Sequence, residues 1–134
     1  MESKKDFIMR IIQLLLDLLG KISNNINEKN LDDAKKQLDY SYKLLNNNKS
    51  FFTTSSLEDL TTFFKIDEDK HNLKKIEILG KLFFYEAKLG NEKSKKVLLK
   101  KSKEMFQYYL QNSEDFSLGI INYMNKIDFE LGKK

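Results

Sequence analysis

The chain has 134 residues and a formal charge of +4, enough length for one hydrophobic core but not for a second domain, so we predict a single domain over residues 1–134. It contains no cysteine, which excludes disulfides, cysteine nucleophiles and thiolate metal sites and favours a cytoplasmic location. It also contains no proline and only five glycines, a composition typical of all-α proteins.

The surplus of basic residues is small, because 24 lysine and arginine side chains are interspersed with 20 acidic ones. Arg10 is the only arginine, so the bidentate contacts that read bases and phosphates have almost no residue to make them. The composition therefore does not favour nucleic acid as a partner.

The first predicted helix covers residues 4–27, with Ser3 or a neighbouring residue as its N-cap, and includes the apolar run FIMRIIQLLLDLL at residues 7–19. On a helical wheel its polar residues share a stripe about 80° wide, and apolar residues cover most of the rest. The polar residues are Asp6, Arg10, Gln13, Asp17, Lys21 and Asn24. So narrow a stripe predicts that other helices or a second copy of the chain cover this helix on two or three sides. The candidate interface residues are Phe7, Met9, Arg10, Ile12, Leu15, Leu16 and Leu19.

A membrane span is not predicted from this helix, because the run is short of the roughly 20 apolar residues required and contains Arg10, Gln13 and Asp17. A secretory signal is not predicted either, since charges interrupt the run and no small-residue cleavage site follows Leu19. Peripheral binding to a membrane surface stays an alternative, although the polar stripe is poor in lysine.

Arg10 has two interpretations. It makes either an i, i+4 pair with Asp6 on the surface, a contribution of a few tenths of a kcal/mol, or a contact with a carboxylate of a partner. A lone arginine among apolar residues is typical of interface centres.

Asn30 is predicted to cap the second helix, which ends before Asn46. Its apolar face comprises Leu31, Ala34, Leu38, Tyr42 and Leu45. Residues 46–56 are predicted to form a loop whose adjacent phenylalanines, Phe51 and Phe52, fold back onto the core.

A short third helix is predicted over residues 57–64. Its N-terminus is opened either by Ser56 with Asp59 or by Ser55 with Glu58. Its apolar face comprises Leu57, Leu60, Phe63 and Phe64.

Residues 69–89 and 92–111 are predicted to form an antiparallel helical hairpin, with Gly90 and Asn91 as a left-handed stop between them. The buried face of the first helix comprises Leu73, Ile76, Leu79, Gly80, Phe83, Phe84 and Ala87. That of the second comprises Val97, Leu98, Ser102, Met105, Phe106 and Tyr109.

A sixth helix is predicted after a cap formed by Asn112 with Asp115, and Gly132 ends it. Its apolar stripe comprises Phe116, Ile120, Tyr123, Met124 and Ile127. Gly119 is predicted to mark a close approach to another helix.

Few residues of the chain have the chemistry of a site. His71 is the only histidine and is predicted to be a surface residue at a helix start, because no second histidine or cysteine completes a zinc site. The run Asp67 to Asp69 lacks the glycine and distal glutamate of a calcium loop and is predicted to stabilise the helix N-terminus. No catalytic, metal-binding or cofactor-binding residue is therefore predicted.

Lys93, Lys96, Lys100 and Lys103 share one face of the fifth predicted helix. They are either an ordinary solvated face or an anion-facing stripe for phosphates or an acidic partner. The solvated face is the commoner explanation, because no arginine or exposed aromatic platform accompanies them.

The segment Leu79-Gly80-Lys81-Leu82-Phe83, followed by Ala87 and Gly90-Asn91, resembles a tetratricopeptide repeat, with Ser102 as the nearest equivalent of the small residue in its second helix. The opening Asp6-Phe7-Ile8-Met9-Arg10, together with the segments up to Tyr109, is similar to a family of small uncharacterised bacterial proteins that open on Asp-[Tyr/Phe]-Ile-Met-Arg. The resemblance implies stacked helical hairpins and no particular activity.

The sequence thus predicts an all-α fold of about six helices, stacked as a right-handed tetratricopeptide-like array with the apolar first helix on or between the hairpins. It predicts a non-catalytic module that binds a protein or peptide partner, or a second copy of itself through the first helix. The alternatives are a peripheral membrane protein or a nucleic-acid-binding protein that uses the first helix or the lysine stripe.

Overall fold

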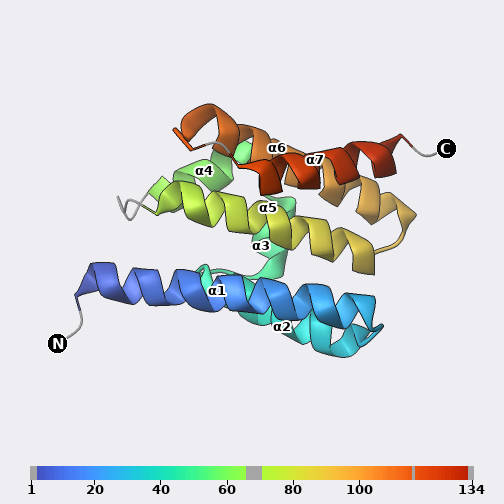
Figure 1. The fold of residues 1–134 in the computed structure, drawn as a ribbon, viewed down its shortest axis with the longest axis horizontal. Coiled ribbons are helices and arrows are strands. Elements are labelled where there is room, and N and C mark those ends of the chain that lie inside the picture. The colour runs from blue at the N-terminus through green and yellow to red at the C-terminus, as the bar shows by residue number, and fades with distance from the viewer. Residues whose placement is uncertain (1–2, 66–70, 116, 133–134) are drawn as a thin grey trace. The chain divides into compact units, whose positions relative to one another are not determined.

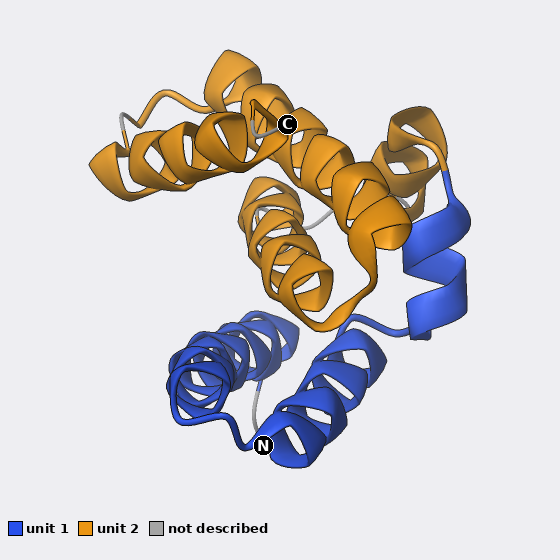
Figure 2. Cartoon of the chain, turned by 90° about the vertical axis from the view of Figure 1, so that its right-hand side faces the viewer, with its two compact units in different colours: residues 1–55 blue, residues 56–134 orange. Residues whose placement is uncertain are grey.

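The computed structural model describes residues 3–65, 71–115 and 117–132 (Figure 1). These ranges contain seven α-helices and no strand, so the prediction of an all-α fold is confirmed. The chain forms two compact units (Figure 2): unit 1 is residues 1–55 and unit 2 is residues 56–134. A single domain over residues 1–134 stays a prediction.

Unit 1 is built on an antiparallel hairpin of α1 (Lys4–Asn27) and α2 (Leu31–Leu44). Of the predicted caps of α1, the structure has Ser3, whose hydroxyl accepts a hydrogen bond from the Asp6 amide at 3.1 Å. Within the unit, α1 and α2 each bury one apolar face, as periodicity predicts. The apolar side chains that are at most 2% exposed in the two helices and just after α2 are Leu15, Ile22, Ala34, Leu38, Tyr42 and Leu45.

The predicted cap of α2 is wrong in its chemistry. Asn30 occupies the N-cap position, but its side chain makes no capping hydrogen bond. The Asn30 side-chain amide instead donates to the Asn25 side-chain oxygen at 3.5 Å. The Asn25 side-chain amide in turn donates to the Gln37 side-chain oxygen at 2.8 Å. These side chains therefore join the end of α1 to α2 rather than satisfying the first amides of α2.

The predicted loop over residues 46–56 contains a helix, α3 (Lys49–Thr54), which the sequence did not predict. Asn48 caps it by accepting from the Phe51 amide at 2.8 Å, and the Thr53 hydroxyl donates to the Lys49 carbonyl at 2.8 Å. Serine and threonine usually favour turns because they bond to nearby backbone, and here the same bonds support one and a half helical turns. Phe52 is fully buried and stacks on Tyr42 at 5.7 Å, which confirms that this segment reaches the core.

Unit 2 contains α4 (Leu57–Lys65), α5 (Asn72–Leu89), α6 (Glu92–Asn112) and α7 (Leu118–Leu131). Of the two predicted caps of α4, the structure has Ser56, whose hydroxyl accepts from the Asp59 amide at 3.1 Å. The predicted start of α5 at Asp69 lies outside the described residues, and His71 is its N-cap.

The predicted antiparallel hairpin of α5 and α6 is confirmed. Gly90 is not left-handed, however, since its φ of −94° and ψ of 174° are those of an extended residue. The turn is made by an extended Gly90 and by Asn91, whose side chain caps α6 by accepting from the Ser94 amide at 2.9 Å. The chain therefore reverses without the positive φ that a glycine stop usually supplies.

The two helices of the hairpin are in close contact at Gly80. The Ser102 hydroxyl of α6 donates to the Gly80 carbonyl of α5 at 2.6 Å. A methyl group on Gly80 would lie 2.8 Å from the Phe106 ring and 3.1 Å from the Met105 Cβ. The absence of a side chain at Gly80 is thus what allows Phe106 to be fully buried against α5.

The helix most deeply buried in the described chain is α5. From Lys75 to Ala87 every side chain except that of Lys81 is buried, and these positions surround the helix. The buried Glu77 carboxylate lies 2.7 Å from the Lys74 ammonium, outside hydrogen-bonding angles, and 3.5 Å from that of Lys81. These ion pairs compensate the charge of a carboxylate that burial would otherwise disfavour.

Two details of α6 and α7 differ from the prediction. On α6, Val97 is 51% exposed and Leu99 takes its place in the buried face. At α7 the cap is Ser117, which accepts from the Ile120 amide at 3.2 Å, rather than Asn112 with Asp115, since α6 continues through Asn112.

Gly119 is exposed in the first turn of α7 and marks no close approach, whereas Gly132 does end the helix. Ile120 and Ile127 are buried as predicted. Phe116, predicted to belong to the same stripe, lies outside the described residues.

A pair of tyrosines, Tyr85, which is buried, and Tyr123, which is half-buried, joins α7 to α5. The Tyr85 and Tyr123 hydroxyls are 2.7 Å apart, and the Tyr123 ring also lies 5.1 Å from Phe84 and 5.5 Å from Phe106. Burial and the hydrogen bond to Tyr85 raise the pKa of Tyr123 well above its usual value. The phenol therefore stays protonated at neutral pH, where its hydroxyl remains available for the hydrogen bond to Tyr85.

We expect the substitution Tyr123→Phe to lower the free energy of unfolding by about 1–3 kcal/mol, because it leaves the buried Tyr85 hydroxyl without this partner. The double substitution Tyr85→Phe with Tyr123→Phe should cost less than the sum of the two single changes, since no hydroxyl is then left behind. Urea unfolding followed by circular dichroism measures all three variants. Strictly additive losses would show that the two hydroxyls do not interact.

Candidate functional site

The first candidate site is the solvent-facing side of α1. All six polar residues of the predicted stripe are exposed, as the helical wheel predicts. They follow each other along the helix as Asp6, Arg10, Gln13, Asp17, Lys21 and Asn24. The Gln13 amide donates to the Asp17 carboxylate at 3.1 Å, which holds that carboxylate on the helix surface.

The seven candidate interface residues are divided by the structure. Ile12, Leu15 and Leu19 are buried and belong to the core, and Leu16 is half-buried. Phe7, Met9 and Arg10 are exposed. Of the seven predicted residues, only Phe7, Met9 and Arg10 are therefore fully available to a partner, and Leu16 is available in part.

Leu14 is a further exposed apolar residue that the sequence did not single out. It is 39% exposed, beside Phe7 at 55% and Met9 at 49%. Because residues seven apart lie on the same side of a helix, Phe7 and Leu14 form one apolar edge of the polar stripe, and Met9 and Leu16 form the other. The seven-residue spacing could have identified these exposed positions from the sequence. It was not apparent there because nearly every residue of the run 7–19 is apolar.

We define the α1 face as the polar stripe with these two edges. Its charged residues alternate in sign in the order Asp6, Arg10, Asp17 and Lys21. Each negative charge therefore has a positive one about a helical turn or two away, a pattern suited to a surface that pairs with a reversed copy of itself.

The second candidate, the lysine stripe of α6, is only partly open. Lys93, Lys96 and Lys100 are exposed, as a solvated face would be. Lys103 lies 2.6 Å from Asp128 of α7, so its charge is already paired within unit 2. A surface of three separated lysines without arginine offers a phosphate only point charges.

The described part of the chain contains no group of three histidine, aspartate or glutamate side chains that could hold a metal ion. His71 is half-buried at the start of α5, in agreement with its predicted position at a helix start. The acidic run Asp67 to Asp69 lies outside the described residues. None of the helices that the structure describes is both long and apolar enough to cross a membrane.

Comparisons of the chain with family models, with curated proteins and with solved structures find no match. The resemblance to the small bacterial family and to tetratricopeptide repeats therefore stays a prediction.

Proposed function

We propose that the protein is a non-catalytic helical interaction module that self-associates by pairing the α1 faces of two copies. The observation that carries this proposal is the composition of the α1 face: exposed Phe7, Met9 and Leu14 flank a stripe of alternating charges. Exposed apolar side chains at the edge of a polar stripe are typical of surfaces that a partner covers.

The order of the charges specifies the arrangement of the two copies. In an antiparallel pair with its two-fold axis between Gln13 and Leu14, Arg10 of one copy lies opposite Asp17 of the other. Asp6 then lies opposite Lys21, because residues 6 and 21 are equally far from that axis. A two-fold pair uses the same surface on both copies, so one helix face supplies all four charge contacts.

The apolar residues fit the same arrangement. Leu14 is next to the axis, so it meets the same residue of the second copy, and Phe7 lies over the segment that contains Leu18 and Lys21. Two helices in contact approach to about 8–10 Å, a distance at which these side chains interdigitate. Since the α1 face exposes only three large apolar side chains per copy, we expect reversible association rather than a permanent dimer.

The proposal includes a tetratricopeptide-like stacking of helical hairpins and a cytoplasmic location. The antiparallel hairpins of α1 with α2 and of α5 with α6 support the first, as does the contact of Gly80 with Ser102, two small residues of the kind that such repeats place between helices. The absence of cysteine suits the reducing cytoplasm.

Light scattering coupled to size exclusion tests self-association over a range of protein concentrations. We expect the apparent mass to rise from 15.9 kDa towards twice that value as the concentration increases, and to fall again in the variant Leu14→Asp. A mass that stays at 15.9 kDa at every concentration contradicts the proposal. A dimer that persists in the variant at all concentrations contradicts the assignment to the α1 face.

A further inference from the structure

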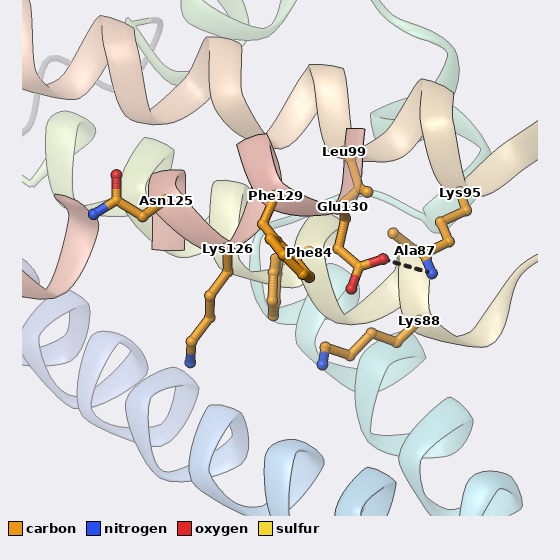
Figure 3. Close-up of a pocket in the computed structure, with 9 residues that line it drawn as sticks. All are labelled: Phe84, Ala87, Lys88, Lys95, Leu99, Asn125, Lys126, Phe129 and Glu130. Atoms are coloured by element: carbon orange, nitrogen blue, oxygen red, sulfur yellow. Dashed lines mark ion pairs between the residues drawn. The ribbon is translucent and has the colours of Figure 1, made fainter. Parts of the chain in front are cut away.

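Unit 2 contains a cavity of about 380 Å³ lined by side chains of three helices (Figure 3). This volume lies in the range of small-molecule sites, roughly 300–1,000 Å³. Its lining residues are Phe84, Ala87 and Lys88 of α5, Lys95 and Leu99 of α6, and Asn125, Lys126, Phe129 and Glu130 of α7.

The inner wall of the cavity is apolar. Phe84, Ala87 and Leu99 are buried, and their side chains carry no hydrogen-bonding groups. Phe129 lies at the rim and is 68% exposed, the highest value among the large apolar side chains that the structure describes. A ligand with an apolar body would cover this ring and remove it from water, which is the main source of affinity in such sites.

The rim is cationic. Figure 3 shows Lys88 and Lys126 extending on either side of the Phe84 and Phe129 rings. The Lys88 ammonium lies 5.0 Å from the centre of the Phe84 ring, and that of Lys126 lies 5.9 Å from the centre of the Tyr123 ring. Both ammonium groups therefore lie over aromatic rings. The carboxylate of the cavity lining, Glu130, forms its ion pair with Lys95 instead.

The other two charged residues of the lining, Lys95 and Glu130, form an ion pair with each other. Lys95 lies 3.2 Å from Glu130, which fixes the one carboxylate of the lining at the α6 side. The lining thus has three ammonium groups and one carboxylate, so an anion is attracted and a cation is repelled. A cation–π contact is worth only about 0.5–1 kcal/mol at an exposed site, so an anion can draw Lys88 and Lys126 from the rings at low cost.

We propose that this cavity binds a small amphipathic carboxylate, a molecule with one carboxylate on an apolar chain or ring of about ten heavy atoms. The apolar body lies against Phe84, Leu99 and Phe129, and the carboxylate lies between Lys88 and Lys126. Every residue of the site belongs to unit 2, so the site is separate from the α1 face and does not depend on self-association.

Octanoate is the probe for this site. We expect saturable chemical-shift changes in the ¹H–¹⁵N spectrum of the protein, concentrated in α5, α6 and α7 around the lining residues. Octanol and octylammonium have the same apolar body without the negative charge, and each should bind at least tenfold more weakly. An equal affinity for octylammonium, or no saturable change with octanoate, overturns the proposal.

A pair of matched variants separates the site from general charge effects. The double substitution Lys88→Gln with Lys126→Gln should weaken octanoate binding at least tenfold. Lys93→Gln with Lys100→Gln removes the same charge from exposed residues of α6 outside the cavity and should change the affinity less than twofold. Phe129→Ala, at an exposed position that should not impair folding, provides an independent test of the apolar contact and should also weaken binding. Equal losses in the two lysine variants overturn the assignment to the cavity.

Discussion

The substitution Gly80→Val will lower the free energy of unfolding of unit 2 by about 2–3 kcal/mol, the cost of overpacking a filled core. Even a single methyl group at Gly80 would lie 2.8 Å from the Phe106 ring and 3.1 Å from the Met105 Cβ. Phe106 is fully buried and cannot turn away, and a Cβ moves only with its helix. The helices α5 and α6 must therefore separate, which also stretches the bond from Ser102 to the Gly80 carbonyl.

Gly20→Ala is the matched control for this prediction. Gly20 lies within α1, and nothing is within 4 Å of a methyl group placed on it. Alanine at an open helical position is favourable by roughly 0.5–1 kcal/mol, so we expect this variant to be slightly more stable than the parent. Chemical denaturation followed by circular dichroism measures both. Equal stability of the two variants would show that the close approach at Gly80 contributes nothing.

The substitution Arg10→Glu will raise the dissociation constant of the proposed dimer by about 10- to 100-fold. Each antiparallel dimer contains two pairs of Arg10 with Asp17, and exposed pairs are worth about 0.2–1 kcal/mol each. Reversal of the charge converts both attractions into repulsions, and each 1.4 kcal/mol of lost free energy weakens binding tenfold. Sedimentation equilibrium at low ionic strength measures the constant, because salt screens exposed charges.

Addition of Asp17→Lys to the Arg10→Glu variant should restore association. The double variant again places opposite charges at positions 10 and 17 of the two copies, with the signs exchanged. Lys36→Glu alters the net charge as Arg10→Glu does, but on an exposed position of α2, and should leave the constant within threefold of the parent value. If Asp17→Lys weakens the dimer further, the antiparallel register is wrong.

The helices of this protein were largely predictable because their signals are local. Ser3 before an apolar run, the two residues Gly90 and Asn91 between two amphipathic segments, and Gly132 after the last stripe each mark a boundary through backbone chemistry that a few neighbouring residues determine. Residues of one helical face, such as Leu38 and Tyr42, are buried together for the same reason.

The wrong predictions concern residues whose structure or burial depends on contacts with other parts of the chain. Lys49–Thr54 reads as a loop from its serine and threonine content, but burial of Phe52 against Tyr42 and the hydroxyl bonds make it helical. Periodicity placed Val97 in the buried face of α6, but in the structure Leu99 is buried there and Val97 is exposed. The sequence predicted that α1 would be the helix covered on most sides. In the structure that helix is α5, whose buried residues include even Lys75 and Glu77.

The candidate sites were predictable to different degrees. The polar stripe of α1 was predicted in full, but which apolar neighbours remain exposed depends on α2 and the core, so Ile12 and Leu15 were proposed for a surface while Leu14 was missed. The cavity of unit 2 was not predicted at all. Its residues come from three helices, and no spacing within one helix brings Lys88 close to Lys126.

Single cysteines test the antiparallel pairing of the α1 faces most directly, since the chain has no cysteine of its own. A disulfide requires Cα atoms within about 7 Å, and Leu14 is next to the proposed two-fold axis. The two copies of Asn24 would be separated by about 30 Å along the helices, at a rise of 1.5 Å per residue. Under mild oxidation we expect Leu14→Cys to form a covalent dimer and Asn24→Cys to remain monomeric. Dimers of both variants would indicate a parallel pair, and dimers of neither would contradict self-association through α1.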